Sequence, residues 1–250
     1  MPFFTYQGRQ LFYREHGGGP PLVVLPGNTA SSACHEAELI HFGLHYHTIG
    51  FDFPGTGRSD RVAHWVHDWW AEGAAAVVAL LDHLEVPRAV IMGTSGGAVV
   101  ALLLAIGWPQ RVRAVIADSA VAQIPAEALR ALLAERAQHS AGQVEFWRAA
   151  HGDDWAEVVD ADTAMLAGYS DTGIDYFGGR LGRIGCPVLL TASLADSLLP
   201  DVGPQLCAMA RAIPHSRLLL VNAGDHPLMW SRPEDFRAAA DTFLRLLPRE

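Results

Sequence analysis

The sequence contains no lysine, because all 18 of its basic residues are arginine. Schiff-base chemistry and a Ser-Lys dyad both require a lysine amine, so both are excluded. Cysteine is scarce as well, and the few cysteines are odd in number and scattered: Cys34, Cys186 and Cys207. This pattern argues against a disulfide framework or a thiolate metal site. We expect a reducing cytoplasmic location and no metal or other cofactor.

Long apolar runs are also missing. No run reaches the roughly 18 residues that span a membrane. Residues 1–10 lack a basic region followed by an apolar core, so we expect no signal peptide. The formal net charge of −9 and the pI near 5.7 disfavour binding to nucleic acid or anionic lipid. A small-molecule substrate is therefore the expected partner, and the expected state is a monomer or homodimer.

What the sequence does contain is a regular alternation of strand-like and helical patterns. At 250 residues and 50% hydrophobic, the chain can bury a large core. Helical patterns, among them 35–44, 65–84 and 233–247, separate the apolar strand-like runs, which are 21–25, 46–51, 89–92, 112–117, 187–192 and 217–221. This alternation predicts an α/β fold with a mostly parallel, twisted sheet covered by helices.

Residues 120–183 have a different character. They show helical patterns at 125–138, 144–151 and 155–166, a Gly-rich stretch and no convincing strand. We therefore expect a core of residues 1–119 and 184–250 with a helical cap, residues 120–183, inserted over the carboxyl-terminal edge of the sheet, where ligands of open sheets bind. The cap has an acidic stretch from Asp153 to Asp175, which indicates either a solvated helix face or a rim that attracts cations.

The stretch Gly93-Thr94-Ser95-Gly96-Gly97 lies between a short β-branched run and a long Ala/Leu-rich run. A serine with glycine two positions before and after it, at a sharp strand-to-helix turn, is typical of a nucleophile elbow. The following helix would direct free backbone N–H groups and its positive end at the atom that Ser95 attacks. The alternative is a tight Gly-rich turn with no catalytic role.

A serine nucleophile needs a histidine base, and that histidine needs an acid that fixes its tautomer. Among the 12 histidines, His226 lies in the loop after the last strand, where the base is expected. For the acid we favour Asp196, after strand 187–192, over Asp118, which could instead cap a helix or accept a loop hydrogen bond. Asp225 is too close in sequence to His226 to reach its ring.

Acyl transfer also needs two hydrogen-bond donors for the developing oxyanion. We expect the backbone N–H groups of Gly96 and Asn28 to be these donors, with Gly27 as the alternative to Asn28. The interpretation without function is that residues 26 and 27 form a plain Pro-Gly turn. The residues expected to contact the substrate are Thr94, Leu198, Leu199, Met229 and Trp230. Three tryptophans either line an acyl pocket or pack in the core: Trp65, Trp69 and Trp70.

With these parts in place, the chain resembles the α/β-hydrolase fold superfamily over essentially its full length. The resemblance also includes the loop Asp52–Ser59, which matches Asp-x-x-Gly-x-Gly-x-Ser, and Pro200 four residues after Asp196. The chain is most similar to small capped serine hydrolases, such as the valacyclovir hydrolase-like esterases and the carbon–carbon bond hydrolases.

The resemblance implies a Ser95–Asp196–His226 triad, an oxyanion hole from Asn28 and Gly96, and a helical lid over residues 120–183. Pro26-Gly27 replaces the usual His-Gly before the oxyanion residue, and Gly96 stands where valacyclovir-type enzymes carry an aspartate. Because the nucleophile position is serine, epoxide hydrolase and haloalkane dehalogenase activities are set aside.

These inferences predict a serine hydrolase that cleaves a small, largely apolar carboxylic ester, thioester or lactone through an acyl-enzyme on Ser95. One alternative keeps the triad but makes the protein a carbon–carbon bond hydrolase, lyase or cyclase of secondary metabolism. Another is a ligand-sensing hydrolase-fold protein with slow turnover. Fold alone does not choose among them.

Overall fold

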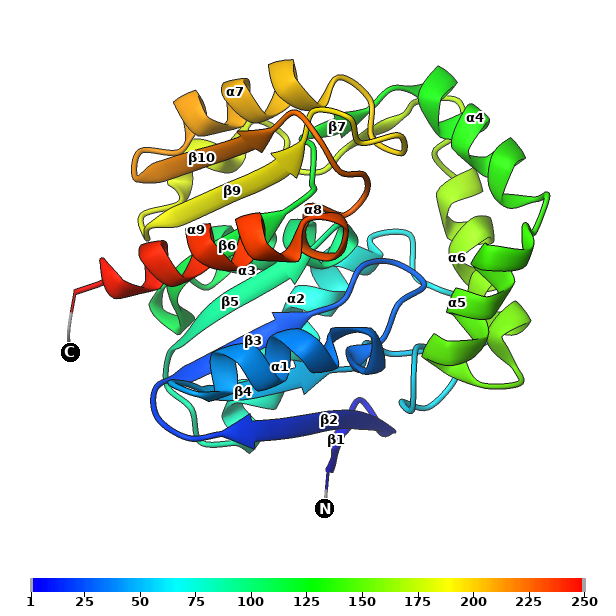
Figure 1. The fold of residues 1–250 in the computed structure, drawn as a ribbon. Helices are drawn as coiled ribbons and strands as arrows, with labels where there is room; N and C mark the ends of the chain where they lie inside the picture. The colour runs from blue at the N-terminus through cyan, green and yellow to red at the C-terminus, as the bar shows by residue number, and fades with distance from the viewer. Residues whose placement is uncertain (1, 249–250) are drawn as a thin grey trace.

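The computed structural model describes residues 2–248, which build one eight-stranded sheet (Figure 1). Its order is β1-β2-β4-β3-β5-β6-β9-β10, in which β2 is antiparallel to both neighbours and the pairs from β4 to β10 are parallel. The strands are β1 Phe3–Tyr6, β2 Arg9–Gly17, β3 Pro21–Leu25, β4 His47–Phe51, β5 Ala89–Thr94, β6 Val112–Asp118, β9 Val188–Ser193 and β10 Ser216–Val221. The expected mostly parallel sheet is confirmed.

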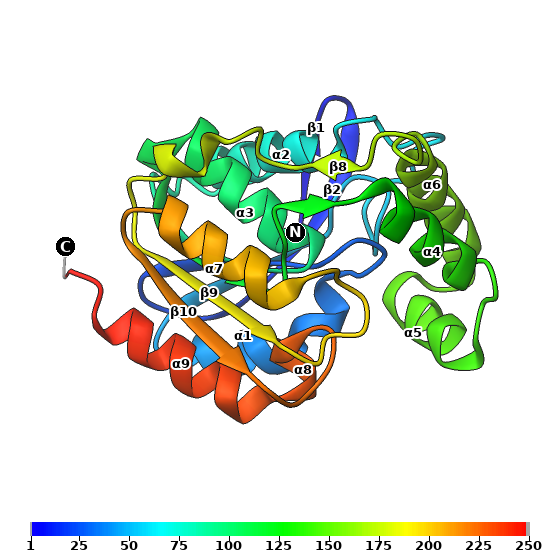
Figure 2. The ribbon, with the colours of Figure 1, turned by 90° about the horizontal axis from the view of Figure 1, so that it is seen from above.

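Helices cover both faces of this sheet. Along β3, Val23 and Leu25 enter one core cluster while Leu22 and Val24 enter the other, as the period of two in a strand requires. Figure 2 shows α2, α3 and α7 on one side and α1 and α9 on the other. The helices are α1 Glu36–Gly43, α2 Trp69–His83, α3 Gly96–Gly107, α7 Val202–Ala212, α8 Leu228–Ser231 and α9 Pro233–Arg245.

Two elements of the core differ from the sequence expectation. The helix expected over 65–84 begins at Trp69, because the Asp68 side chain accepts a hydrogen bond from the Ala71 N–H (3.2 Å) and caps the helix there. Between β9 and β10, where no helix is predicted above, the chain forms α7. Its buried residues Val202, Leu206 and Met209 recur at helical spacing.

Residues 120–183, called the cap segment below, contain α4 Ala126–Arg136, α5 Ala141–His151 and α6 Trp155–Ala167. These helices lie beyond the carboxyl ends of the parallel strands (Figure 1). Contrary to expectation, the segment also contains two short antiparallel strands, β7 Gln123–Ile124 and β8 Ile174–Asp175. The division into core and cap domains stays a prediction, and its ends at residues 1, 249 and 250 lie outside the described chain.

None of the helices formed by residues 2–248 is long and apolar enough to cross a membrane.

Candidate active site

Ser95 occupies a strained turn between β5 and α3. Its φ of 53° and ψ of −125° are unusual for a residue with a side chain. The Ser95 N–H donates to the Asp118 carbonyl oxygen (2.8 Å), which ties the turn to β6. A Cβ on Gly93 would overlap the backbone of Gly97, so this close crossing requires glycine. The predicted sharp turn is present, and the nucleophilic role of Ser95 stays a prediction.

His226 and Asp196 meet across two loops at the carboxyl ends of β9 and β10. The His226 Nδ1 and Asp196 Oδ2 atoms are 2.8 Å apart, and the Asp196 side chain is fully buried. The other carboxylate oxygen, Oδ1, accepts the N–H groups of Leu198 and Leu199, both at 3.0 Å. A carboxylate fixed at Nδ1 favours the tautomer that leaves Nε2 free to accept a proton.

The Ser95 hydroxyl and the His226 ring line the same cavity. Within residues 2–248, however, no hydrogen bond joins Ser95 Oγ to the His226 ring, whose Nδ1 is bound to Asp196. Such bonds are often long in enzymes without substrate and shorten in the Michaelis complex. The structure thus brings the three predicted catalytic groups to one edge of the sheet.

The competing carboxylates have other partners. Asp118 is fully buried, and burial raises its pKa to about 6. It accepts hydrogen bonds from Thr94 Oγ1 (3.1 Å), Thr191 Oγ1 (2.6 Å) and the Met229 N–H (3.0 Å). Asp225 accepts the backbone N–H of His226 (2.8 Å) and the N–H and hydroxyl of Ser197. Asp196 is therefore the carboxylate in contact with the imidazole.

Two backbone N–H groups are available beside Ser95. Within the described chain, neither the Asn28 nor the Gly96 N–H donates to another protein group. A Cβ on Gly96 would overlap Asn28 Oδ1 and lie 3.2 Å from Asn28 N, so the two residues adjoin. This arrangement is the one that an oxyanion hole at Ser95 would require.

Two cavities adjoin at Ser95. The larger, about 420 Å³, is lined by residues that include His226, Pro227, Trp230, Gln143, Phe146 and Trp147. The smaller, about 60 Å³, is mainly apolar and is lined by residues that include Gly96, Val99, Val121, Leu129, Leu166 and Tyr176. The residues common to both are Asn28, Ser95, Leu132, Arg136 and Leu198.

Most of the predicted pocket residues line these cavities. Thr94 and Trp230 line the larger one, Leu199 lines the smaller one and Leu198 lines both. Met229 lines neither, which corrects the sequence expectation. Its side chain is fully buried in the core cluster on the face covered by α1 and α9, because α8 turns it away from the active-site edge.

Arg136 is a cavity residue that sequence reasoning did not select, whereas Trp70 is one of the three tryptophans considered above for the pocket. Arg136 of α4 lines both cavities and pairs with the buried carboxylate of Asp162 on α6. Trp70 lines the smaller cavity, and its Nε1 donates to Asn28 Oδ1 (3.2 Å), whereas Trp65 and Trp69 stack on each other in the core (4.8 Å).

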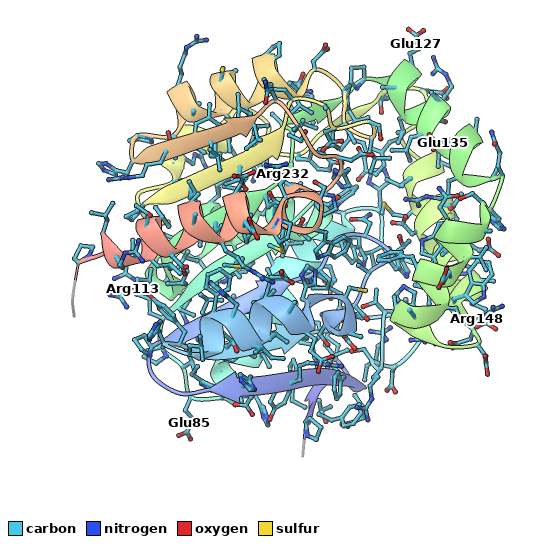
Figure 3. All side chains as sticks on the ribbon, in the orientation of Figure 1. Glu85, Arg113, Glu127, Glu135, Arg148 and Arg232 are labelled. Carbon is cyan, nitrogen blue, oxygen red and sulfur yellow. The ribbon has the colours of Figure 1, made fainter. Side chains whose placement is uncertain are left out.

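The acidic stretch of the cap segment has two kinds of member. Five of its residues are exposed, as expected for a solvated face: Asp153, Glu157, Asp160, Asp171 and Asp175. Asp154 pairs with Arg61 (2.8 Å), and Asp162 is buried. Figure 3 shows the side chains on α4–α6, with Glu135, which lines the larger cavity, on α4 and the exposed Arg148 on α5.

The positions that could have revealed Asp162 are its neighbours on α6. Val158, Val159, Met165 and Leu166 are buried at helical spacing, and Asp162 falls on the same face. A carboxylate on a buried face needs a partner, so the helical spacing of these apolar residues is the signal that could have identified Asp162 in the sequence. No group of His, Cys, Asp and Glu residues in the described chain is arranged to hold a metal ion.

The chain is similar to known proteins in both sequence and structure. A family model described as alpha/beta hydrolase fold matches residues 20–170. The protein named "Putative carbamate hydrolase RutD" from Pseudomonas syringae pv. syringae (strain B728a) is 27% identical over 257 residues, covering 94% of this chain and 97% of its own.

Solved structures agree over nearly the whole chain. A hydrolase from Pseudomonas aeruginosa PA01 is 25% identical, covers 97% of both chains and has a TM-score of 0.77. Est816, described as an N-acyl homoserine lactone degrading enzyme, is 27% identical, covers 97% of this chain and 100% of its own, and has a TM-score of 0.77.

Proposed function

Because this chain belongs to the alpha/beta hydrolase fold family, we propose that it is a serine hydrolase that cleaves a small, largely apolar carboxylic ester, thioester or lactone. Hydrolysis as the reaction type is supported by the family and by relatives named as hydrolases. The observation that carries the serine mechanism is the hydrogen bond between the buried Asp196 carboxylate and the His226 ring, which lines the cavity of Ser95.

In the proposed first step, His226 Nε2 takes the proton of the Ser95 hydroxyl while Oγ attacks the substrate carbonyl carbon. The carbonyl oxygen becomes an oxyanion, which accepts hydrogen bonds from the N–H groups of Asn28 and Gly96. Asp196 stabilises the imidazolium through Nδ1. Collapse of the intermediate transfers the proton from His226 to the leaving group and leaves an acyl group on Ser95. Water, deprotonated by His226, then releases the acid.

The two cavities give the substrate an orientation. His226 lines only the larger cavity, and the leaving group must lie near His226 because it takes the proton from that ring. We therefore assign the leaving group, which is the alcohol or thiol part of the substrate or the alkoxide end of a lactone, to the larger cavity. The acyl chain is assigned to the smaller one. The size and apolar lining of the smaller cavity favour short, uncharged acyl chains.

The names of the relatives suggest two further probes. The lactone-degrading relative supports inclusion of lactones among the substrates, and the carbamate hydrolase name makes a carbamate the natural comparison. In both classes the attacked atom is a carbonyl carbon with a heteroatom leaving group, so the same groups serve.

The test is turnover of p-nitrophenyl acetate and butyrate by the intact protein and by Ser95→Ala. We expect the variant to lose at least about 10⁴-fold in kcat with folding unchanged, because removal of the nucleophile leaves only binding and the oxyanion hole. In the unaltered protein, a fluorophosphonate probe should modify the peptide that contains Ser95.

A matched control is Ser216→Ala, at the opposite end of β10, where the hydroxyl bonds to the Ala210 carbonyl. This variant should keep full ester turnover. Equal kcat/KM values for the wild type and Ser95→Ala would refute the proposed function. Turnover of a vinylogous diketone with no activity on esters, lactones or carbamates would point to carbon–carbon cleavage instead.

A further inference from the structure

The loop that follows β3, residues 27–32 and here called the oxyanion loop, is held by the cap segment. Asn28 Nδ2 donates to Asp162 Oδ1 (2.6 Å), and Thr29 Oγ1 accepts from Trp147 Nε1 (3.2 Å). Two more contacts reach α5: the Thr29 carbonyl to His151 Nε2 (2.9 Å), and the Ser31 hydroxyl to the Ala150 carbonyl (2.8 Å). The loop that offers an oxyanion donor is thus tied to α5 and α6.

Asp162 is the charged member of this set. Its side chain is fully buried, and its two oxygens are committed to different partners: Oδ1 to Asn28 and Oδ2 to Arg136 of α4. A buried carboxylate is tolerated only when it is paired and hydrogen-bonded. The Asn28 amide therefore supplies one of the bonds that Asp162 needs.

The amide of Asn28 is fixed at both of its polar ends. Nδ2 is bound to Asp162, and Oδ1 accepts from Trp70 Nε1 (3.2 Å). The next residue, Thr29, has a φ of 55°, which is strained for a β-branched residue. Such a backbone conformation persists only where surrounding contacts enforce it. Without them the loop would relax, and the Asn28 N–H would turn away from Gly96.

We propose that Asp162 is a positioning residue that holds the oxyanion donor of Asn28 in place through the Asn28 side chain, so that docking of the cap segment and completion of the oxyanion hole are one event. This inference rests on the proposed function, because it assigns a second role within the same site. It also gives α6 a positioning role, in addition to lining the smaller cavity through Leu166.

Asp162→Asn is the informative variant because it keeps the side-chain volume. Arg136 donates to one position, which the amide oxygen of the new asparagine would occupy, and its NH₂ group would then face the NH₂ group of Asn28. Two donors cannot bond, so the link to Asn28 is lost, while Arg136 keeps a hydrogen bond to an oxygen that is now neutral. We expect kcat for p-nitrophenyl butyrate to fall about 10- to 100-fold, less than the complete loss of one oxyanion donor, with KM nearly unchanged.

Asn28→Ala attacks the same link from the loop and keeps the backbone N–H. If Asp162 acts through Asn28, the double variant should be no slower than the slower single variant, which is the non-additivity of a shared path. The matched control is Asp160→Asn, which removes a charge from the exposed side of α6. It should leave kcat at the wild-type value.

A second measurement separates oxyanion binding from general damage. Sulfur is a weaker hydrogen-bond acceptor than oxygen, so a working oxyanion hole favours the ester over its thiono analogue. The kcat/KM for the ester divided by that for the thiono analogue should fall in Asp162→Asn and in Asn28→Ala but not in Asp160→Asn. Melting temperatures and circular dichroism identify any variant that fails to fold, and in that case the remaining single variant decides.

The outcomes separate the two proposals. If Ser95→Ala abolishes turnover while Asp162→Asn and Asn28→Ala both behave like Asp160→Asn, the positioning role is wrong and the hydrolase stands. Fully additive losses in the double variant would also overturn the positioning role. Undiminished turnover by Ser95→Ala would overturn the proposed function itself.

Discussion

At the scale of single residues, three aspartates compete for the role of the acid beside His226, and their contacts rank them. Asp196 bonds to the ring Nδ1, Asp225 bonds to the backbone of His226, and Asp118 bonds to Met229 and two threonines. Only the first of these contacts reaches a ring nitrogen, so only Asp196 can set the tautomer of the imidazole.

Asp196→Asn should therefore lower kcat for p-nitrophenyl butyrate by about 10⁴-fold at neutral pH, because an amide at this position stabilises the wrong tautomer. Asp225→Asn removes a carboxylate beside His226 that does not contact the ring, and it should lower kcat by less than about 10-fold. Steady-state kinetics of both variants decide the matter. A larger loss for Asp225→Asn than for Asp196→Asn would reverse the assignment.

The residue scale also shows how far the sequence could lead. Ser95, Asp196 and His226 could be selected because each follows a predicted strand, and parallel strands end at one edge. Met229 could not be placed correctly, because one turn of α8 decides whether a side chain faces the cavity or the core. Asp162 was hidden among exposed acidic neighbours, although its helical position indicated burial.

At the scale of elements, α4 lines both cavities, whereas α5 lines only the larger one. Leu129 of α4 is fully buried and lines only the smaller cavity. Phe146 of α5 lines only the larger one. If the acyl chain occupies the smaller cavity, these two side chains contact different halves of the substrate.

Leu129→Ala should shift the acyl preference towards longer chains, because it enlarges the smaller cavity. We expect the ratio of hexanoate to acetate turnover to rise about 10-fold or more, as about two methylenes become accommodated. Phe146→Ala is the paired variant: it should leave this ratio unchanged and alter the preference among alcohol groups. A chain-length profile of p-nitrophenyl esters and an alcohol series of butyrates measure both effects. The opposite pattern would reverse the assignment of the cavities.

Elements also differ in how predictable they are. The central strands were visible because each is a buried apolar run, and α9 because its apolar residues recur at helical spacing. Strands β7 and β8 have two residues each, too few to show any period. The start of α2 depends on one capping contact of Asp68, which periodicity does not register.

At the scale of the whole molecule, the fold shifts the pKa values of several buried groups away from their values in water. Burial lowers the pKa of His35 to about 3 and that of His151 to about 4, from 6.5. Burial raises the pKa of Asp118 to about 6, from 3.8. These groups link the free energy of unfolding to pH with opposite signs.

The signs follow from proton counts. Between the folded and unfolded pKa values of a buried histidine, the unfolded chain binds a proton that the folded chain does not, so stability falls as the pH drops from about 6.5. For Asp118 the folded chain keeps a proton that the unfolded chain has released, so its contribution rises as the pH drops from about 6 towards 4. Asp118 therefore offsets about one of the two histidines in this range.

His35→Leu isolates one of these contributions. In residues 2–248 neither ring nitrogen of His35 has a hydrogen-bond partner, and the ring packs against Trp230 (5.2 Å between centroids). The nearby Glu38 carboxylate, 3.9 Å from Nδ1, is bonded to Arg237. Leucine has no proton to bind, so the variant should gain stability relative to the wild type on acidification.

The expected gain is about 2 kcal/mol at pH 5 compared with pH 7.5, since each pH unit below about 6.5 is worth about 1.4 kcal/mol for one group. Urea unfolding of both proteins at the two pH values measures it. Leu44→Ala, at an exposed position of the same region, removes no titratable group and should change the unfolding free energy by the same amount at both pH values. If His35→Leu also gives equal changes at pH 5 and pH 7.5, His35 takes up its proton in the folded chain as readily as in the unfolded one, and acid stability must then be set by other groups.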